Sequence, residues 1–333
     1  MKLIKGINNY KENKKCFLTI GTFDGIHQGH QKIIKNLVSE SRKKNLLSVV
    51  LTFSPHPRIV LQKDTSIKLI DTIDEKISIL KKMGVDVLVI HPFTISFSKL
   101  GPLEFTQEIL VKIFKIHKLF IGFDHRFGKN REASVDDLIE YGPKYNFKVK
   151  KIRAFEIDKI NISSTKIRNE ILKGNLDVVN KFLGRPFILS GNIKKGDGIG
   201  RKINFPTANL EIKENHKIVP AKGVYIIKCN ILNTDYLGMM NIGNRPTLNG
   251  KNQTIEIHFF NFNKDIYELK IQVFIIKKIR DEIKFSSLNA LKNQLKKDKI
   301  KCINISKESQ NFKSISLWKN ILNYVRVKLY KRE

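Results

Sequence analysis

The chain has 333 residues, more than one hydrophobic core usually organises, so we expect two domains. Its hydrophobic content of 41% allows packed cores and argues against wholesale disorder. A formal net charge of +31 raises the hypothesis of nucleic-acid binding, but the lysines are scattered, many on the polar sides of helical patterns.

Cysteine use and hydropathy predict a cytoplasmic protein that is not inserted in a membrane. The three cysteines, Cys16, Cys229 and Cys302, are far apart and form no CxxC pair, which fits a reducing compartment. The first residues lack the apolar segment of a secretory signal, and no apolar run approaches the roughly 18–20 residues that cross a bilayer.

The first half of the chain alternates short runs of β-forming residues with amphipathic helical patterns. The segment 102–118 is one such helix, in which Ile109 pairs with Ile113 and Leu110 with Phe114 at i,i+4 spacing. This alternation predicts an α/β fold of nucleotidyltransferase type, with a doubly wound parallel sheet covered on both faces. The expected strands are 16–21, 46–53, 85–90, 118–123 and 147–152.

After about residue 185, strand-like segments follow one another closely, with Gly, Pro and Asn between them. These closely spaced strands predict a small antiparallel β-barrel, and a helical pattern from about Ser287 predicts a C-terminal helix. We therefore place the domains at 1–184 and 185–333, with the short helical segment 173–187 as linker material. The expected barrel strands are 187–193, 223–231, 236–243, 254–262 and 269–276.

The segment IGTFDGIHQGH, residues 20–30, carries the first set of candidate functional residues. It follows a predicted strand, and a helical pattern begins at about Gly29, so His27 and His30 lie where backbone N–H groups favour anions. The glycines at 21, 25 and 29 let the backbone turn sharply and approach a phosphate closely. Histidines beside a triphosphate are expected to become cationic and stabilise its charge.

HxGH at this position resembles the signature of nucleotidyltransferases and class I aminoacyl-tRNA synthetases. The longer string FDGIHQGH resembles the adenylyltransferase module of bacterial bifunctional riboflavin kinase/FAD synthetases. A KMSKS-like loop, which a synthetase would need, is not present in the sequence. The resemblance implies catalytic roles for His27 and His30 and nucleotide contacts from Gly21, Phe23, Asp24 and Gly25.

Three further segments resemble motifs of that module, in the same order. TFSPHP at 52–57 contains His56, and IGFDHRFGK at 121–129 contains Asp124, and the resemblance implies that both residues contact the nucleotide. In the second of these motifs, His125 replaces the usual Phe. ISSTKIR at 162–168 opens a predicted helix, where hydroxyl, N–H and guanidinium groups favour an anion. The implied phosphate contacts in this last motif are Ser163, Ser164, Thr165 and Arg168.

The glycine-rich segment 196–210 contains the first of a second group of candidate functional residues. It fits neither G-x-G-x-x-G nor the Walker pattern, but its PTAN sequence offers the oxygens of Thr207 and Asn209 two residues apart, suitable for Mg²⁺ or phosphate. An ordinary Asx or Thr turn is the competing interpretation of PTAN alone. We also expect nucleotide contacts from Gly196 and Arg201 in this segment.

Downstream segments follow the order of the riboflavin kinase module of the same family. The strand 254–260 alternates, with Ile255, Ile257 and Phe259 on one face and Glu256 and His258 on the other. The resemblance implies that Glu256 is the general base and that Thr207 and Asn209 handle Mg-ATP.

Three residues depart from the family pattern in the kinase half. Asn204 and Glu268 stand where glycine is usual, and Asn261 stands where aspartate is usual. Asn204 tolerates left-handed backbone geometry. None of the three removes a proposed catalytic group, but the changes leave open a weakened or silent kinase.

The sequence thus predicts an enzyme that phosphorylates riboflavin to FMN and adenylylates FMN to FAD, using ATP and Mg²⁺. The partners expected are the small molecules riboflavin, FMN and ATP, with no membrane and no specific nucleic acid, and self-association stays open. The alternatives are an FAD synthetase whose kinase half is weakened or silent, and a basic nucleic-acid-binding protein.

Overall fold

The computed structural model describes residues 1–63, 66–122, 135–153, 155–158, 160–195, 199–247 and 250–311. The chain divides into two compact units, Met1–Ser164 and Thr165–Glu333. Of the helices in the described ranges, none combines the length and apolar character that a membrane span requires. The predicted domain boundary at 184/185 stays a prediction. The short helix expected there exists as α8 (Leu176–Leu183), and it ends at Gly184 with a left-handed φ of 61°.

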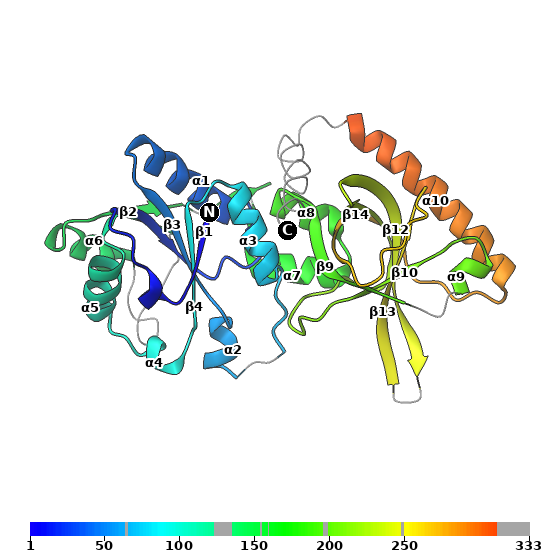
Figure 1. Cartoon of the computed structure of the whole chain (residues 1–333), viewed down its shortest axis with the longest axis horizontal. Helices are drawn as coiled ribbons and strands as arrows, with labels where there is room; N and C mark the ends of the chain where they lie inside the picture. The colour runs from blue at the N-terminus through cyan, green and yellow to red at the C-terminus, as the bar shows by residue number, and fades with distance from the viewer. Residues whose placement is uncertain are drawn as a thin grey trace, which may run out of the picture. The chain divides into compact units, whose positions relative to one another are not determined.

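The first unit is built on a six-stranded sheet in which all neighbouring strands are parallel (Figure 1). The spatial order is β1-β4-β3-β2-β5-β6, so the chain runs outward from β2 in both directions. The strands are β1 (Lys2–Lys5), β2 (Cys16–Ile20), β3 (Leu47–Phe53), β4 (Val87–His91), β5 (Ile116–Gly122) and β6 (Lys148–Ile152).

The predicted parallel sheet is confirmed, and one of its strands was missed. Every expected strand is present within three residues of its predicted ends, because each is rich in residues that are buried on both faces. The missed strand is β1, four residues at the sheet edge with only Ile4 buried, too short and too polar to stand out in the sequence. An antiparallel pair, β7 (Glu156–Ile157) with β8 (Ile160–Asn161), precedes the ISSTKIR motif.

Helices cover both faces of this sheet. Leu18 and Val49 belong to a core that includes Leu110 and Leu138 from the helical segments of one face, whereas Phe17 and Val50 are buried on the other face. The helices of the unit, with a 3-10 turn at Ile7–Asn9, are α1 (Gln28–Lys43), α2 (Pro57–Leu61), α3 (Ile73–Lys82), α4 (Ile95–Ser98), α5 (Pro102–Glu104), η2 (Phe105–Ile113) and α6 (Val135–Lys144).

The amphipathic helix expected at 102–118 is shorter and differently wound. After α5 it continues as η2, a π-helix, and the Phe114 N–H donates to the Ile109 carbonyl, five residues back, at 3.0 Å. Ile109, Leu110 and Phe114 are buried as the pattern required, and β5 takes over at Ile116.

The second unit is a closed antiparallel barrel preceded by two helices, α7 (Ser164–Lys173) and α8. The barrel order is β10-β13-β12-β11-β14-β9, closed on itself. A short helix, α9 (Ile199–Lys202), precedes β10. The strands are β9 (Phe187–Lys194), β10 (Ala208–Glu211), β11 (Gly223–Ile231), β12 (Thr234–Thr247), β13 (Gly250–Phe259) and β14 (Lys270–Arg280). The predicted barrel is confirmed. Its missed strand, β10, includes Ala208 and Asn209 of the PTAN segment, for which a turn was the competing interpretation.

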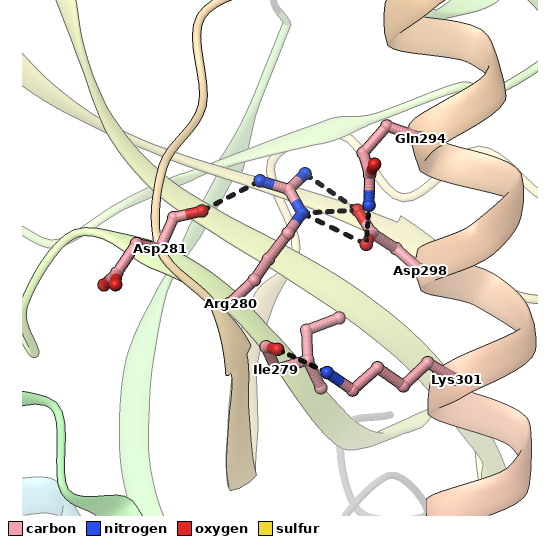
Figure 2. Close-up of polar contacts among 6 residues, drawn as sticks. All are labelled: Ile279, Arg280, Asp281, Gln294, Asp298 and Lys301. Atoms are coloured by element: carbon pink, nitrogen blue, oxygen red, sulfur yellow. Dashed lines mark hydrogen bonds and ion pairs between the residues drawn. The ribbon is translucent and has the colours of Figure 1, made fainter.

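The predicted C-terminal helix is α10 (Leu288–Asn311), which runs along one side of the barrel (Figure 1). Apolar contact comes from Leu291, Leu295 and Cys302. Figure 2 shows the polar part: Arg280, the last residue of β14, binds both carboxylate oxygens of Asp298 at 2.7–3.1 Å. Asp298 is 2% exposed and also accepts from Gln294, so its burial is compensated by partners on both sides.

Candidate functional sites

Residues 20–30, which we call the histidine loop, lie at the topological switch point of the parallel sheet. β2 has β3 on one side and β5 on the other, and the chain leaves these strands in opposite directions. In open α/β sheets, ligands bind beyond the carboxyl ends of the strands at this point. The three predicted motifs 20–30, 52–57 and 121–129 begin at the ends of β2, β3 and β5. The carboxyl ends of these three strands therefore lie at one edge of the sheet. Asp124 and the rest of the third motif from residue 123 onward lie outside the described residues.

His27 and His30 form one stacked pair at the start of α1. His27 is the N-cap, and its Nδ1 accepts from the His30 backbone N–H at 3.4 Å. The two rings stack with centroids 3.7 Å apart and planes 20° from parallel. Phe23, also predicted as a contact, packs edge-on against His30. The predicted proximity of the histidines to a helix N-terminus is confirmed.

The backbone before this pair is held in an uncommon conformation. Phe23 and Ile26 have φ of 46° and 35°, and Gly25 has φ of 86°. A side chain at Gly25 would bring its Cβ to 2.9 Å from Ile70, so both space and backbone geometry require glycine there. Gly21 marks the end of β2, and its N–H donates to the Leu51 carbonyl at 3.1 Å. Left-handed non-glycine residues at such a density are typical of functional loops.

Burial changes the charge state that the sequence suggests for the two histidines. It lowers the pKa of His27 to about 4, against a smaller opposing effect of Asp71. Burial, His27 and Lys76 together hold the pKa of His30 well below its usual range. Both rings are therefore neutral at pH 7 without ligand, and the cationic form expected beside a triphosphate stays a prediction. Because His27 Nδ1 accepts a hydrogen bond, its proton is on Nε2, which is left as a donor.

A buried lysine of this site, Lys76, was missed in the sequence. Its Nζ donates to the Thr22 carbonyl at 2.6 Å, inside the histidine loop, and the residue is 6% exposed. Burial lowers the pKa of Lys76, while the carboxylates of Asp24 and Asp71 raise it. A signal was available: on α3, Lys76 stands three and four residues before the buried Ile79 and Leu80, on the apolar face.

Asp24 fixes the loop through its side chain. The residue is 3% exposed, and its Oδ1 accepts from the N–H groups of Ile70 at 2.8 Å and Asp71 at 3.4 Å. Its backbone carbonyl accepts from the Ser164 hydroxyl at 2.9 Å. The structure thus joins Ser164 of the ISSTKIR motif to the histidine loop. A direct nucleotide contact from Asp24 stays a prediction.

The remaining predicted contacts of the first half lie around helix starts. His56 caps α2, with its Nδ1 accepting from the Arg58 N–H at 3.2 Å. Ser163 directly precedes α7, Thr165 on its first turn is exposed, and Arg168 is partly buried. Their roles toward phosphate stay predictions.

The second candidate site centres on Glu256 in β13. Its neighbours across the antiparallel ladder are Asn209 on β10 and Asn241 on β12. Directly opposed residues point to the same face of a sheet, so the predicted base and a predicted metal residue lie side by side. Glu256 is partly buried, whereas Ile255 and Ile257 are buried on the alternate face, as the sequence indicated.

The segment before β10 is compact. The Phe205 N–H donates to the Gly200 carbonyl at 2.8 Å, and a Cβ at Gly200 would lie 2.2 Å from the Phe205 carbonyl oxygen. This close approach requires glycine, and it brings the Thr207 hydroxyl to the same turn, 3.3 Å from that Cβ position. Arg201 on α9 donates to the Tyr267 hydroxyl at 2.9 Å. Gly196 lies outside the described residues.

All three departures in the kinase half adopt positive φ. Asn204, Asn261 and Glu268 have φ of 62°, 55° and 62°. The expectation that Asn204 accepts left-handed geometry is confirmed. Glu268 is the most strained of the three, since Asn visits this region far more readily than Glu. Its carboxylate binds the Lys194 Nζ at 3.0 and 3.1 Å on the surface.

The second candidate site contains oxygen donors of the kind that suits Mg²⁺. Within the described ranges, no three His, Cys, Asp or Glu side chains gather as a metal cluster. The hydroxyl of Thr207 and the amide oxygen of Asn209, beside Glu256, are the hard oxygen donors that Mg²⁺ accepts alongside phosphate oxygens and water.

A parallel sheet with a histidine loop at its switch point, followed by a closed barrel carrying a glutamate beside an asparagine, defines a two-module nucleotide-using protein. The FAD synthetase family model matches residues 9–166, and the riboflavin kinase family model matches residues 183–306. The chain belongs to the bifunctional riboflavin kinase/FMN adenylyltransferase family.

Curated relatives of that name match nearly their whole length. The protein from Buchnera aphidicola subsp. Schizaphis graminum is 42% identical over 303 residues, covering 90% of this chain and 96% of the relative. The Escherichia coli K12 protein is 37% identical with the same coverage. A solved structure from Streptococcus pneumoniae, described as a macrolide-efflux protein, is 32% identical and superposes with a TM-score of 0.84 over 91% of this chain and 99% of that one.

Proposed function

We propose that this chain makes FAD from riboflavin in two steps, phosphorylating riboflavin to FMN and then adenylylating FMN. The observation that carries the proposal is that each family match contains the residues its chemistry needs, already gathered: His27 with His30 in the first, Asn209 with Glu256 in the second. ATP is the co-substrate of both steps, and riboflavin and FMN are the acceptors.

In adenylyl transfer, an FMN phosphate oxygen attacks the α-phosphorus of ATP, and the bond to pyrophosphate breaks. The phosphate is already ionised, so the protein supplies position and charge stabilisation rather than a strong base. The Nε2–H of His27 and the N–H groups at the start of α1 would contact the phosphates. Lys76 contributes positive charge from beneath the loop.

In riboflavin phosphorylation, the terminal ribityl hydroxyl attacks the γ-phosphorus of ATP, and the bond to ADP breaks. Glu256 would take the hydroxyl proton, and Thr207 and Asn209 would hold Mg²⁺ with the nucleotide. When bound, Mg²⁺ neutralises phosphate charge. General-base help is worth about 10²–10⁴-fold, and positioning contributes much of the rest.

Two variants separate the steps within one protein. We expect Glu256→Gln to stop FMN formation while FAD formation from supplied FMN survives. The double change of His27 and His30 to Ala should stop FAD formation from FMN while FMN formation from riboflavin survives. Loss of both activities in either variant, with the protein still folded by circular dichroism, would argue against separate sites. FAD formation at the parent rate by the double variant would refute the role of the histidine loop.

A silent kinase half remains the competing proposal, and the strained Glu268 is the observation that favours it. The cytoplasmic location proposed from the sequence is supported by Cys16, Cys229 and Cys302, all in the described part of the chain, which are free and buried thiols. Self-association stays open, and sedimentation analysis would test it.

A further inference from the structure

The second candidate site contains a buried histidine to which the proposed chemistry gives no role. His258 lies in β13 two residues beyond Glu256, on the same face of the strand. It is 8% exposed, and its ring packs between Phe205 and Phe260, with centroids 5.1 and 5.7 Å away. A buried imidazole needs a hydrogen-bond partner, and His258 has one in a neighbouring segment.

That partner is the backbone carbonyl of Pro206, 2.8 Å from His258 Nδ1. A carbonyl only accepts, so the Nδ1 carries the proton and donates it. Burial lowers the pKa of His258, against the smaller opposing effect of this bond, so the ring is neutral at pH 7 with its proton on Nδ1. Pro206 is the residue directly before Thr207, so the bond attaches the PTAN segment to the strand that carries Glu256.

The hydrogen bond from His258 to Pro206 lies just beyond the end of the backbone pairing between β10 and β13. β10 pairs with β13 only at Ala208, opposite Ile257, and Asn209, opposite Glu256. The next pair in this register would join Thr207 and His258, but β10 begins at Ala208. Proline has no N–H to extend the ladder. The imidazole therefore supplies the contact that fixes the chain just before Thr207.

We propose that His258 is a positioning residue of the kinase reaction, which holds Thr207 and Asn209 against Glu256 through its Nδ1–H bond to Pro206. This inference rests on the proposed kinase function. It places the two oxygen donors for Mg-ATP under control of a side chain that touches neither metal nor nucleotide. Partners of this kind typically change metal affinity or activity about 10- to 100-fold when lost.

Two substitutions separate positioning from packing. His258→Asn keeps an N–H where Nδ1 stood and loses the aromatic ring, whereas His258→Phe keeps the ring and loses the donor. We expect His258→Phe to raise the KM for ATP in FMN formation about 10- to 100-fold with the KM for riboflavin unchanged, and His258→Asn to stay close to the parent. A purely structural role of the ring predicts the opposite order.

FAD formation from supplied FMN serves as the internal control, since it depends on the other unit. If the parent makes no FMN from riboflavin, the proposed kinase function fails before His258 is tested. If the parent is active and His258→Phe matches its KM for ATP, or His258→Asn is as impaired as His258→Phe, the positioning role is refuted. If His258→Phe does not fold, His258→Gln, which moves the donor away from the Nδ1 position, must show the raised KM for ATP, and a normal value refutes the inference.

Discussion

His27 and His30 stack on each other at the N-terminus of α1, and burial keeps both rings neutral at pH 7. A stacked neutral pair is a hydrogen-bonding surface rather than a cationic one. The resting loop therefore avoids the repulsion of two adjacent imidazolium ions, and the amino group that contacts the loop is that of Lys76 on α3.

The neutral pair makes stability depend on pH. The pKa of His27 falls from 6.5 when unfolded to about 4 when folded, so the unfolded chain binds more protons between these values. Stability from this group is therefore full above pH 6.5 and lost as pH falls toward 4, by about 3 kcal/mol. Urea unfolding of the first unit at several pH values should show this fall. His27→Asn, which retains an N-cap, should reduce this fall and leave the part that comes from His30, and an unchanged slope would contradict the assignment.

Removal of Lys76 should impair adenylyl transfer. Lys76→Met loses the bond to the Thr22 carbonyl and leaves Asp24 and Asp71 buried without this cation, so we expect FAD formation from FMN to fall about 10- to 100-fold. The pKa of His30, measured by NMR titration, should rise because a like charge is gone. Lys35→Met, on the exposed side of α1, is the control. Parent-like FAD formation and an unmoved His30 pKa in Lys76→Met would dismiss this role.

The contact between Arg280 and Asp298 should dominate the docking of α10 on the barrel (Figure 2). Asp298→Asn leaves a largely buried guanidinium without its counter-charge, at a cost of about 3–5 kcal/mol. Asp177→Asn, which removes an exposed partner of Lys277 in the same unit, should cost less than about 1 kcal/mol. Denaturant unfolding of the second unit compares them, and equal losses would contradict the importance of burial.

Backbone strain at Glu268 predicts an order between two substitutions. Both Glu268→Gly and Glu268→Ala lose the surface contact with Lys194, but only glycine accepts the φ of 62° without strain. We expect the glycine variant to be more stable than the alanine variant by about 1 kcal/mol in thermal unfolding. An alanine variant of equal or greater stability would show that no strain is present at this position.

The sequence predicted the elements whose character is local. The segment 223–231 is rich in apolar and β-forming residues, and it is β11 with those bounds. The strands β1 and β10 were missed because each has four residues, and their pairing comes from neighbours far along the chain. The π-helical winding of η2 has no simple sequence pattern.

The residues of the candidate sites also fall into two groups, those that local sequence motifs identify and those whose role depends on the folded structure. His27, His30, Thr207, Asn209 and Glu256 could be identified because they belong to ordered motifs of a family. Lys76 was missed and His258 was noted without a role, since their importance arises from burial and from single contacts with carbonyl groups in distant segments. The charge state of the histidines also depends on burial, which local sequence does not report.

The central claim is that one chain carries out both steps, and product chromatography tests it most directly. The purified protein is incubated with riboflavin, ATP and Mg²⁺, and in parallel with FMN, ATP and Mg²⁺. We predict FMN and then FAD in the first reaction, and FAD in the second. FAD from supplied FMN alone would contradict the kinase half, and no FAD in either reaction would contradict the adenylyltransferase half.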